Sequence, residues 1–403
     1  MQVTGTNGKT SVTRIASALL SAHGERTGTY TSPHLIAYTE RICVDGSPLS
    51  GEEFAAAIFA VAAVTDELIA HHAETLGVEP RSLQSPYTEF EILTAAALWS
   101  FAKRRCSWAC LEVGMGGRWD ATSVVSPVVS VVTGVGLDHT ERLGTTCEAI
   151  AADKAHIIKP GSVAVLGPGC EGVEDAFTER IAATGASFVR VGLADEDVAW
   201  RITARPERPG GQMLMDVYGL YATYDKLSVV APSYQAPNIA TAIAAVEAAL
   251  GRALEPDTVR ATLAALVFPG RFEQLEADPP LVIDGAHNPQ AAEVLASAIE
   301  EAFGQRRPVM VLGILRDKDG EGIVRALAPS VSAFICTQSS SSRSLSADEL
   351  ATVVETVTGL RPDVETALSC ALDRARDLAV DSGTGVVVAG SLYAAGEVRG
   401  FAG

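Results

Sequence analysis

The residues best suited to chemistry stand near the start of the chain, in the stretch TGTNGKTS. The stretch combines glycines, a lysine and hydroxyl side chains, and its members are Gly5, Thr6, Asn7, Gly8, Lys9, Thr10 and Ser11. Backbone N–H groups of such a loop can surround phosphate oxygens, the lysine can reach the β- and γ-phosphates, and a hydroxyl can bind Mg²⁺. The stretch therefore predicts a nucleotide site. The alternative is an ordinary turn before a helix.

Two predicted elements position this loop. Met1 to Thr4 supplies a short buried strand, and the apolar spacing from Val12 to His23 predicts a helix that ends at Gly24. A helix that opens directly after the loop turns the positive end of its dipole toward a bound anion. The order strand, glycine loop and helix therefore favours phosphate binding.

Further polar side chains follow predicted strands in the first half of the chain. The continuously apolar stretch WACLE (Trp108 to Glu112) predicts a buried parallel strand that ends on a carboxylate, directly before a glycine-rich loop, Gly114 to Ser123. Ligands of open α/β sheets lie at this edge, and Mg²⁺ prefers oxygen ligands. Glu112 is therefore a candidate magnesium ligand, and Ser32, Asp138 and His139 stand in comparable places. The alternatives are a helix-capping carboxylate for Glu112 and a hydrogen-bonded loop histidine for His139.

Helix signals surround these sites. Ser50 with Glu53 and Thr145 with Glu148 each form a capping box, and the second of these helices carries Lys154, by default a solvated lysine. A proline-bearing loop, Pro80 to Pro86, leads to a further helix. Two polar strand-like stretches and two alanine-rich helices follow before residue 267; they are Trp200 to Thr203, Met213 to Tyr218, Asn238 to Leu250 and Pro256 to Leu266.

The pattern restarts after FPGRFE (Phe268 to Glu273), with a regular alternation of strand and helix signals that predicts a second, smaller parallel-sheet domain. There, DGAHNP follows the strand LVID, so Asp284 and His287 are expected at the carboxyl edge of that sheet. Asn288 before Pro289 also reads as a plain helix start. Arg271 could bind a phosphate or could be one more surface arginine.

Composition limits the class of protein. The chain has 403 residues, enough for two domains, with 47% apolar and 20% charged residues and a net charge of -18. This charge argues against nonspecific nucleic-acid binding. Seven cysteines without CxxC spacing fit reduced thiols in a cytoplasm. We find no run of about 18 apolar residues and no signal peptide, so we expect no membrane segment.

The order of motifs resembles the Mur ligase superfamily and, within it, the dihydrofolate synthase/folylpolyglutamate synthase family. The matching stretches run from residue 3 to beyond 390 and are GTNGKTS, YTSPHL, YTERI, TEFEILTAAALW, LEVGMGGRWDATS, GLDHTERLG, DKAHIIKPG, QAPN, FPGRFE, DGAHNP, DKD and GSLY. The resemblance implies an α/β fold: a P-loop NTPase-like, mostly parallel sheet domain over residues 1–270 and a smaller Rossmann-like domain over 271–403. It also implies a monomeric, ATP-dependent ligase that joins L-glutamate to a pteroyl-type acid.

The resemblance assigns roles to individual positions. ATP is bound by the glycine loop and by Gln235, Asn238, Arg271, Asp284 and His287, and one Mg²⁺ ion, or two, by Ser32, Glu112 and His139. Lys154 matches a lysine carried as a carbamate. Lys9, Lys154, Arg271 and His287 are the expected catalytic residues. The acid substrate is expected at Ser32, Pro33, His34, Glu89 and Asp138. Two domains hinged at Phe268 to Glu273 would close around an acyl phosphate and exclude water.

The chain also departs from the family pattern. Family members usually carry a further segment ahead of the glycine loop, and the folate enzymes usually have GKGS where this chain has GKTS. Tyr234 and His156 replace the usual histidine and glycine. Three hypotheses follow: a dihydrofolate or folylpolyglutamate synthase; a paralogue that joins an amino acid to a non-folate acid; and a nucleotide-binding protein without ligase activity.

Overall fold

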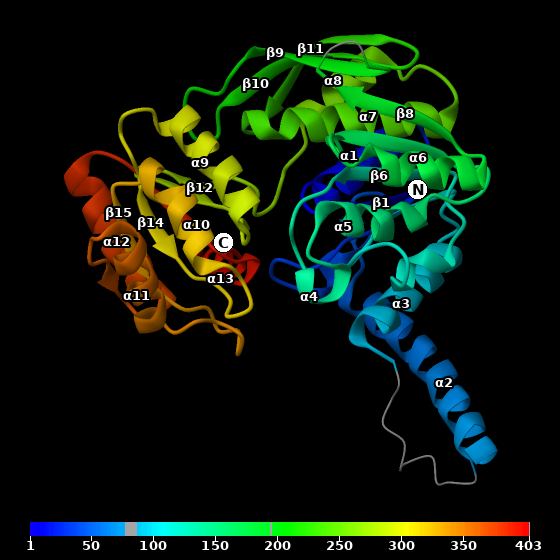
Figure 1. The fold of residues 1–403 in the computed structure, drawn as a ribbon, viewed down its shortest axis with the longest axis horizontal. Helices are drawn as coiled ribbons and strands as arrows, with labels where there is room; N and C mark the ends of the chain where they lie inside the picture. Colours follow the sequence, from blue (N-terminus) through cyan, green and yellow to red (C-terminus); the bar gives the residue numbers. More distant parts are fainter. Residues whose placement is uncertain (77–86, 194–195, 403) are drawn as a thin grey trace. The chain divides into compact units, whose positions relative to one another are not determined.

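The computed structural model describes residues 1–76, 87–193 and 196–402, which form two compact units (Figure 1). The first unit comprises residues 1–199, 218–223 and 237–262, and the second comprises 200–217, 224–236 and 263–403. The predicted loop from Pro80 to Pro86 lies outside the described residues. The domain boundary at residue 270 stays a prediction.

A mostly parallel sheet forms the centre of the first unit. Its strands are β1 (Gln2–Thr4), β2 (Thr27–Tyr30), β3 (Ile42–Val44), β4 (Ser47–Pro48), β5 (Trp108–Glu112), β6 (Val129–Gly134), β7 (Val163–Gly169) and β8 (Ser187–Gly192). They lie in the order β8-β7-β6-β1-β5-β2-β3-β4. The pairs β2–β3 and β3–β4 are antiparallel, and the other pairs are parallel. The three-residue β1 is central because both of its neighbours are long parallel strands, and Val3 is completely buried between them. The predicted strand ahead of the glycine loop is confirmed.

The helices of the first unit begin and end close to the predicted positions. They are α1 (Lys9–Ala22), α2 (Gly51–Leu76), α3 (Glu89–Lys103), α4 (Thr140–Leu143), α5 (Cys147–Lys154), α6 (Glu174–Thr184), α7 (Ala236–Leu250) and α8 (Pro256–Ala264). The cap of α5 was predicted one residue too early, because the hydroxyl of Thr146, not Thr145, accepts the Ala149 amide at 3.3 Å. Helix α7 includes Pro237 in its first turn, where a missing N–H leaves no bond unmade.

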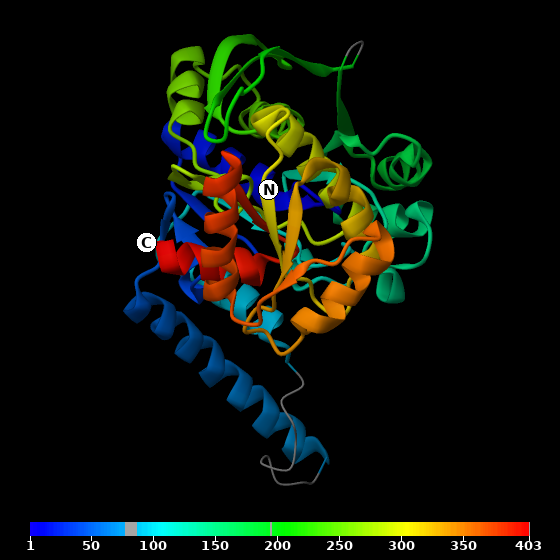
Figure 2. The ribbon, with the colours of Figure 1, turned by 90° about the vertical axis from the view of Figure 1, so that its left-hand side faces the viewer.

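Helix α2 projects from the sheet of the first unit (Figures 1 and 2). The reciprocal bonds between Ser50 and Glu53 confirm the predicted capping box at its start. Among the described residues, one stretch, Gly51 to Thr75 of this helix, is long and apolar enough to cross a membrane by length and composition. One such helix does not by itself contradict the expectation of no membrane segment. Core helices of soluble proteins pass the same criterion, although this one is little buried.

Three strands continue the hydrogen-bonded order beyond β8. They are β9 (Val198–Ala204), β10 (Gln212–Tyr218) and β11 (Thr223–Val230). The first two match the predicted polar strands. Strand β11 was not predicted, since its sequence TYDKLSVV alternates only partly, with Tyr224, Leu227 and Val229 buried and charged residues between.

The second unit is built on a six-stranded sheet in the order β12-β13-β17-β14-β15-β16. The strands are β12 (Glu273–Ala277), β13 (Pro280–Ile283), β14 (Val309–Leu312), β15 (Ala333–Cys336), β16 (Asp363–Val364) and β17 (Val386–Ala389). The helices are α9 (Pro289–Phe303), α10 (Gly320–Leu327), α11 (Ala347–Thr358), α12 (Leu368–Ser382) and α13 (Leu392–Ala402). All pairs are parallel except β12 with β13. The predicted alternation of strands and helices is confirmed, and only the short edge strands β12 and β16 were missed.

Both faces of this second sheet are covered. Helices α9, α10 and α11 pack on one another and on one face, where Val282, Met310 and Val387 are buried. Because side chains alternate along a strand, the neighbouring Ile283, Val311 and Val388 point to the opposite face, and α12 and α13 contact β14 and β17. A sheet buried on both faces requires continuous apolar strands, which is why VMVL and VVVA were recognisable in the sequence.

Candidate active site

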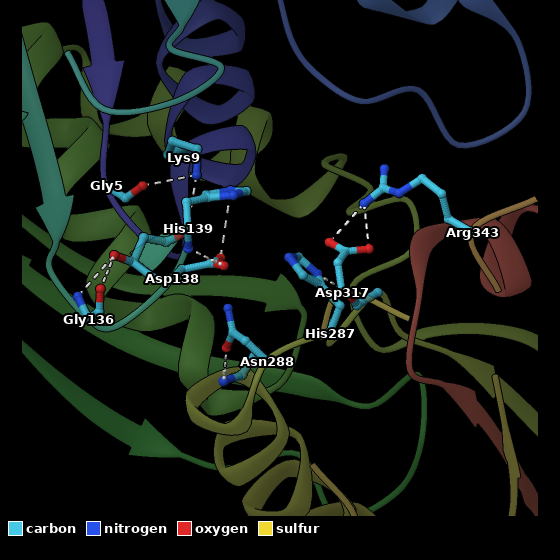
Figure 3. Close-up of polar contacts among 12 residues, drawn as sticks. Gly5, Lys9, Gly136, Asp138, His139, His287, Asn288, Asp317 and Arg343 are labelled. Atoms are coloured by element: carbon cyan, nitrogen blue, oxygen red, sulfur yellow. Dashed lines mark hydrogen bonds and ion pairs between the residues drawn. The ribbon is translucent and has the colours of Figure 1, made fainter. Parts of the chain in front are cut away.

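The glycine loop connects β1 to α1 at the centre of the first sheet (Figure 3). The ammonium of Lys9 donates to the carbonyls of Gly5 at 2.9 Å and Thr6 at 3.1 Å, and the Thr6 amide donates to Gly134 at 2.9 Å. A lysine held over its own loop places a positive charge where the resemblance puts the ATP phosphates. This geometry is the one that the sequence pattern predicts for a phosphate-binding loop.

Gly8 is the residue on which α1 begins, and its backbone is left-handed, with φ +85°. A Cβ atom here would lie 2.5 Å from Oδ1 of Asn238, the first-unit residue expected to face adenine. Both the conformation and the space therefore require glycine. The sequence indicated a close approach at this position but could not show that Asn238 is the group that comes close.

Gly8→Ala is expected to lower the free energy of unfolding by about 2–5 kcal/mol, because a left-handed alanine adds to a collision with Asn238. Gly24→Ala is a matched control, with φ +89° and open space around the added Cβ, and should cost only about 1–2 kcal/mol. Urea denaturation of both variants measures the difference. Equal losses in the two variants would show that the Asn238 contact is unimportant.

Glu112, at the end of β5, is 1% exposed and lies against the glycine loop. Its two oxygens accept the hydroxyl of Thr10 at 2.8 and 3.0 Å, and Oε2 also accepts the Ser32 amide at 3.0 Å. The carboxylate thus bonds a side-chain hydroxyl of α1 and a loop amide. Two of the three predicted metal ligands, Glu112 and Ser32, come together in the structure.

The donor set around Glu112 fits a divalent ion of the magnesium type. A single buried carboxylate beside two hydroxyl-bearing residues offers oxygen ligands and one negative charge, and Mg²⁺ usually takes one or two protein carboxylates together with phosphate oxygens and waters. Among the described residues, no three His, Cys, Asp or Glu side chains converge on one point. A site of this kind would thus be completed by the nucleotide.

His139 lies on the other side of the loop. It has a left-handed backbone, with φ +52°, at the start of α4, and its side chain is 40% exposed with Nε2 3.9 Å from Asp138 Oδ2. Figure 3 shows it beside Lys9. Its predicted role as a metal ligand stays a prediction.

A small polar cavity of about 10 Å³ joins four of the predicted residues. Lys9, Asp138, His139 and Lys154 all line it, together with residues 4–6, residues 113–116 and Leu143. Lys9 is more than a hundred residues away in the chain from the other three. The cavity has room for about one water molecule, so these four side chains lie close to one another.

Lys154 is 4% exposed at the end of α5, so the default reading of a solvated lysine is wrong. Burial, and after it the neighbouring charge of Lys9, lowers the pKa of Lys154 to about 7, although Asp138 and Asp153 oppose this shift. A substantial fraction of this amine is therefore neutral near neutral pH. A neutral amine is nucleophilic, which a solvated lysine is not.

Two aspartates shape the glycine-rich loop that covers Lys154. Asp153 Oδ1 accepts the Gly117 amide at 2.8 Å, and Asp120 Oδ2 accepts the amides of Gly114 and Met115 at 3.0 and 3.1 Å. Burial raises the pKa of Asp120, and these hydrogen bonds oppose that rise. Neither aspartate was predicted as a site residue. The motif GMGGRWDATS contained a signal for Asp120, because an aspartate there follows loop residues whose backbone amides need an acceptor.

Part of the predicted acid-substrate set forms one cluster around Arg41. Its guanidinium donates from Nε to His34 Nδ1 at 2.9 Å, lies 3.7 Å from Glu89 Oε1, and stacks over Tyr38 at 5.3 Å. Burial, and after it Arg41, lowers the pKa of His34. Arg41 and Tyr38 were missed as site residues, although YTERI was recognised as a motif. Asp138 lies in the Lys9 cavity instead.

The order of the loop after β2 depends on one carboxylate. Glu40 accepts three successive amides, those of Leu35 at 2.9 Å, Ile36 at 3.0 Å and Ala37 at 2.9 Å. The peptide bond between Ser32 and Pro33 is cis. The loop that carries Ser32, Pro33 and His34 is therefore held by the Glu40 bonds and by the bond from the Ser32 amide to Glu112.

In the second unit, Asp284 connects three segments. Its buried carboxylate accepts the Phe272 amide at 2.7 Å, the Ala286 amide at 2.8 Å and the Tyr234 hydroxyl at 3.0 Å. Burial raises the pKa of Asp284, with Arg271 and these bonds opposing the rise. Asp284 thus anchors the FPGRFE segment beside DGAHNP, and Tyr234, which departs from the family pattern, takes part directly.

Arg271 and His287 lie in this same region. Arg271 Nη1 donates to Gly270 at 3.0 Å and would collide with any Cβ on Gly285, while the Gly285 amide donates to Gly270 at 2.9 Å. His287 Nδ1 lies 2.8 Å from the Gly285 carbonyl, an acceptor only, so Nδ1 carries a proton and donates it. The residues predicted for this edge of the second sheet are brought together.

Asn288 and Gln235 each lie directly before a helix. Asn288 Oδ1 accepts the Ala291 amide at 2.8 Å, which confirms it as the cap of α9. Gln235 is fully buried in a short 3₁₀ turn. Near His287 in Figure 3, Arg343 forms a two-pronged ion pair with Asp317 at 2.8 and 2.9 Å.

A glycine loop on a central parallel strand, with a buried acidic strand end beside it, defines a nucleotide-binding unit of the Mur ligase class. The match to family models agrees: residues 54–246 match the Mur ligase middle domain, and residues 270–392 match the Mur ligase glutamate ligase domain. The chain is 36% identical over 423 residues to the dihydrofolate synthase/folylpolyglutamate synthase of Mycobacterium tuberculosis, covering 99% of this chain and 85% of that protein. The chain belongs to the dihydrofolate synthase/folylpolyglutamate synthase family.

Solved structures agree with this assignment. The M. tuberculosis folylpolyglutamate synthase with ADP and AMPPCP superimposes with a TM-score of 0.92 at 35% identity, over 100% of this chain and 90% of that one. The Escherichia coli FolC complex with DHPP and ADP gives 0.82 at 29% identity, over 99% and 87%. A Yersinia pestis bifunctional synthase with AMPPNP and a Mn ion gives 0.80 at 29% identity, over 99% and 88%.

Proposed function

We propose that this chain is an ATP-dependent ligase that joins the amine of L-glutamate to the carboxylate of dihydropteroate or of a folate. The observation that carries the proposal is the convergence of Lys9, Asp138, His139 and Lys154 in one polar cavity beside Glu112. Ligase chemistry on ATP needs several positive groups around a transferring phosphoryl group, which nucleotide binding alone does not. Folate as the acid is supported by the names of the relatives and by the DHPP bound to the E. coli protein.

The first unit supplies the residues for phosphoryl transfer. The Lys9 ammonium is already directed to the loop carbonyls, so it stands where the β- and γ-phosphates of ATP would be surrounded by loop amides. Glu112, Thr10 and Ser32 would hold a Mg²⁺ ion, which when bound neutralises phosphate charge. The divalent ion and the ATP analogues in the relatives' structures agree with this arrangement.

The reaction proceeds in two steps. A carboxylate is a poor acyl donor, so its oxygen first attacks the γ-phosphorus of ATP, giving an acyl phosphate and ADP. Lys9 offsets the charge that builds on the transferring group. The neutral amine of glutamate then attacks the acyl carbon, phosphate leaves, and an amide results. Water must be excluded in between, because it would hydrolyse the acyl phosphate.

Lys154 carries a carbamate in this proposal. Its neutral amine attacks CO₂, forms an N–C bond and releases one proton, which converts a buried neutral amine into an anion. The lowered pKa supports this, since the neutral form is available near pH 7. The resulting anion lies in the cavity with Lys9 and His139, where it would orient a second ion or balance the charge of Lys9.

The second unit supplies Arg271, Asp284 and His287, which the family resemblance assigns to nucleotide binding. Asp284 fixes the backbone beside Arg271, and His287 is oriented by the bond from Nδ1 to the Gly285 carbonyl. Further parts of the proposal are a monomeric, cytoplasmic enzyme, acting on a small acid and L-glutamate and not on nucleic acid. The net charge of -18 agrees with this choice of substrates.

The test is the release of ADP from ATP by the purified chain with candidate acids. Turnover that requires both dihydropteroate and L-glutamate supports the proposal, and Lys9→Ala should abolish it. Lys103→Ala, which removes a surface lysine over Trp99, is the control and should leave turnover unchanged. Turnover with some other acid, but with neither dihydropteroate nor tetrahydrofolate, would overturn the folate part. Nucleotide binding without turnover of any acid would overturn the ligase.

A further inference from the structure

A second cavity lies wholly within the second unit, among residues that the proposed reaction does not use except for Arg271. It has a volume of about 390 Å³ and is lined by the turn between β9 and β10, the end of β11, the segment after α8, the start of β12 and one side of α9. Pockets for small organic ligands begin at about 300 Å³. The polar cavity around Lys9 is far smaller and belongs to the first unit.

The walls of this cavity are mostly apolar. They are formed by Val230, Ala231, Leu266, Val267, Ala298 and Ala302. Ala298 and Ala302 are nearly buried and stand one helical turn apart on α9, so two small side chains leave the space open at its floor. Val230 and Val267 are 43% and 60% exposed, which is unusual for valine and places apolar surface at the rim.

The charged residues of the lining leave a positive balance. The carboxylate of Glu273 already has partners: Oε1 lies 3.1 Å from the Arg399 guanidinium, and Oε2 accepts the Gly270 amide at 2.8 Å. Arg208, which is exposed, makes no ion pair with any described carboxylate. Arg271 lines the same cavity. An occupant with one negative group would therefore find a guanidinium without a competing acid.

The turn between β9 and β10 is fitted to the cavity. Gly210 has φ +65°, and a Cβ there would lie 2.0 Å from Oε1 of Gln274, whose Nε2 donates to the Glu276 carbonyl at 2.9 Å. The glycine lets the turn rest directly on β12. Because the turn is fixed, Arg208 at its base has a defined position beside the apolar walls.

We propose that this cavity is a binding site for a small amphipathic acid: an apolar, ring-sized body lying on Ala298, Ala302 and Val230, with a carboxylate-type group on Arg208. Its occupant contacts Phe268 and Arg271 of the FPGRFE segment. On the basis of the proposed function, in which Arg271 binds ATP, occupancy raises KM for ATP. The binding itself does not depend on that function.

The test uses the full chain and 8-anilino-1-naphthalenesulfonate, an aromatic anion whose fluorescence rises in apolar sites. We expect one saturable site. Ala298→Trp, which fills the floor, and Arg208→Glu, which reverses the charge, should each weaken binding by about tenfold or more, or about 1.4 kcal/mol. The matched controls are Val294→Trp, at an exposed position of α9, and Arg252→Glu, at an exposed turn; both should bind as the wild type does.

N-phenyl-1-naphthylamine, the same ring system without the sulfonate, separates the apolar from the anionic part. It should bind more weakly than the sulfonate and should not respond to Arg208→Glu. Sulfonate binding that is absent in the wild type, or unchanged in both cavity variants, would overturn the site; the second result would place the dye elsewhere, such as on the exposed side of α2. Equal affinity for the two dyes would overturn the anion specificity.

The KM for ATP is measured in parallel. The sulfonate should raise it in the wild type and in Val294→Trp but not in Ala298→Trp. A missing effect on KM with intact, variant-sensitive dye binding would overturn the coupling to Arg271 alone. Failure of the ligase assay with every acid would concern the proposed function, while the dye titrations would still decide the site.

Discussion

Replacing Lys154 by methionine is expected to lower ligase turnover by about 100- to 1000-fold, the usual cost of losing one preorganised charged group at a reacting centre. Methionine has a similar length and suits the buried environment of this 4% exposed position, so the fold should be retained. Lys103→Met, at the surface, is the control and should keep full turnover. Wild-type turnover in Lys154→Met would contradict the proposed role.

The carbamate gives this prediction a pH dependence with a definite sign. With a pKa of about 7, the neutral fraction of Lys154 rises from about one tenth at pH 6 to about nine tenths at pH 8. Enzyme freed of CO₂ should therefore regain activity faster at pH 8 than at pH 6, when dissolved CO₂ is held constant. Carbon-13 NMR with labelled bicarbonate should show a carbamate signal in the wild type and none in Lys154→Met. Reactivation that is independent of pH would contradict the mechanism.

The same shift affects stability. The folded-state pKa of Lys154, about 7, lies below the ordinary lysine value of 10.5, so between these values the unfolded chain binds more protons than the folded one. In the CO₂-free enzyme the free energy of unfolding should therefore rise with pH across this window, by up to about 1.4 kcal/mol per pH unit. Lys154→Met should lack this slope and should be more stable than the wild type at pH 7. Denaturant midpoints at several pH values measure both.

The burial of Lys154 is the property that the sequence could least reveal. Its helix has the spacing of a solvated surface helix, and the burial arises from the glycine loop at residues 114–117, which reaches across from a different strand. Gly117 can lie there only because it has no Cβ; a Cβ at this position would come within 2.8 Å of the Lys154 carbonyl. The spacing of apolar residues predicts which side of a helix is buried. It cannot predict the burial of Lys154, because that burial comes from a segment distant in the sequence.

The candidate residues that the sequence predicted share a position: each follows or ends a strand. Glu112 ends the apolar strand β5, Asp284 directly follows the apolar strand β13, and Lys9 follows β1 through the glycine loop. The carboxyl ends of parallel strands meet at one edge of a sheet, so sequence alone can place Lys9 near Glu112 in the first sheet and Asp284 at the corresponding edge of the second. Arg41 was missed because its partners, His34 and Glu89, belong to a loop and to the start of α3, and no periodicity connects those elements.

The smaller discrepancies have local causes. Adjacent threonines at 145 and 146 offer the same hydroxyl to a helix start, and only the backbone conformation chooses Thr146. Strand β12, with sequence EQLEA, is polar because it is an antiparallel edge strand whose residues are all at least partly exposed. Edge strands carry little of the apolar signal by which the central strands were recognised.

Glu112→Gln is the second change with a large expected effect. The amide keeps the size of the side chain and can still accept one hydrogen bond, but it removes the carboxylate charge that lies beside Thr10 and Ser32, and its NH₂ group faces a donor. We expect the Mg²⁺ concentration for half-maximal ADP release to rise by about 10- to 100-fold, the range found when groups that support a metal are lost. Maximal turnover should recover in part at high Mg²⁺.

The matched control for this variant is Glu179→Gln, which removes one carboxylate from the exposed side of α6. It changes the net charge by the same amount and should leave the Mg²⁺ titration unmoved, because charge at that distance is screened. Nucleotide binding in the absence of Mg²⁺ gives an independent readout, which should be nearly equal in both variants, since the loop amides and Lys9 remain. A half-maximal Mg²⁺ concentration in Glu112→Gln equal to the wild-type value would place the ion away from this carboxylate, and the buried bonds to Thr10 and Ser32 would then serve only to hold α1 against β5.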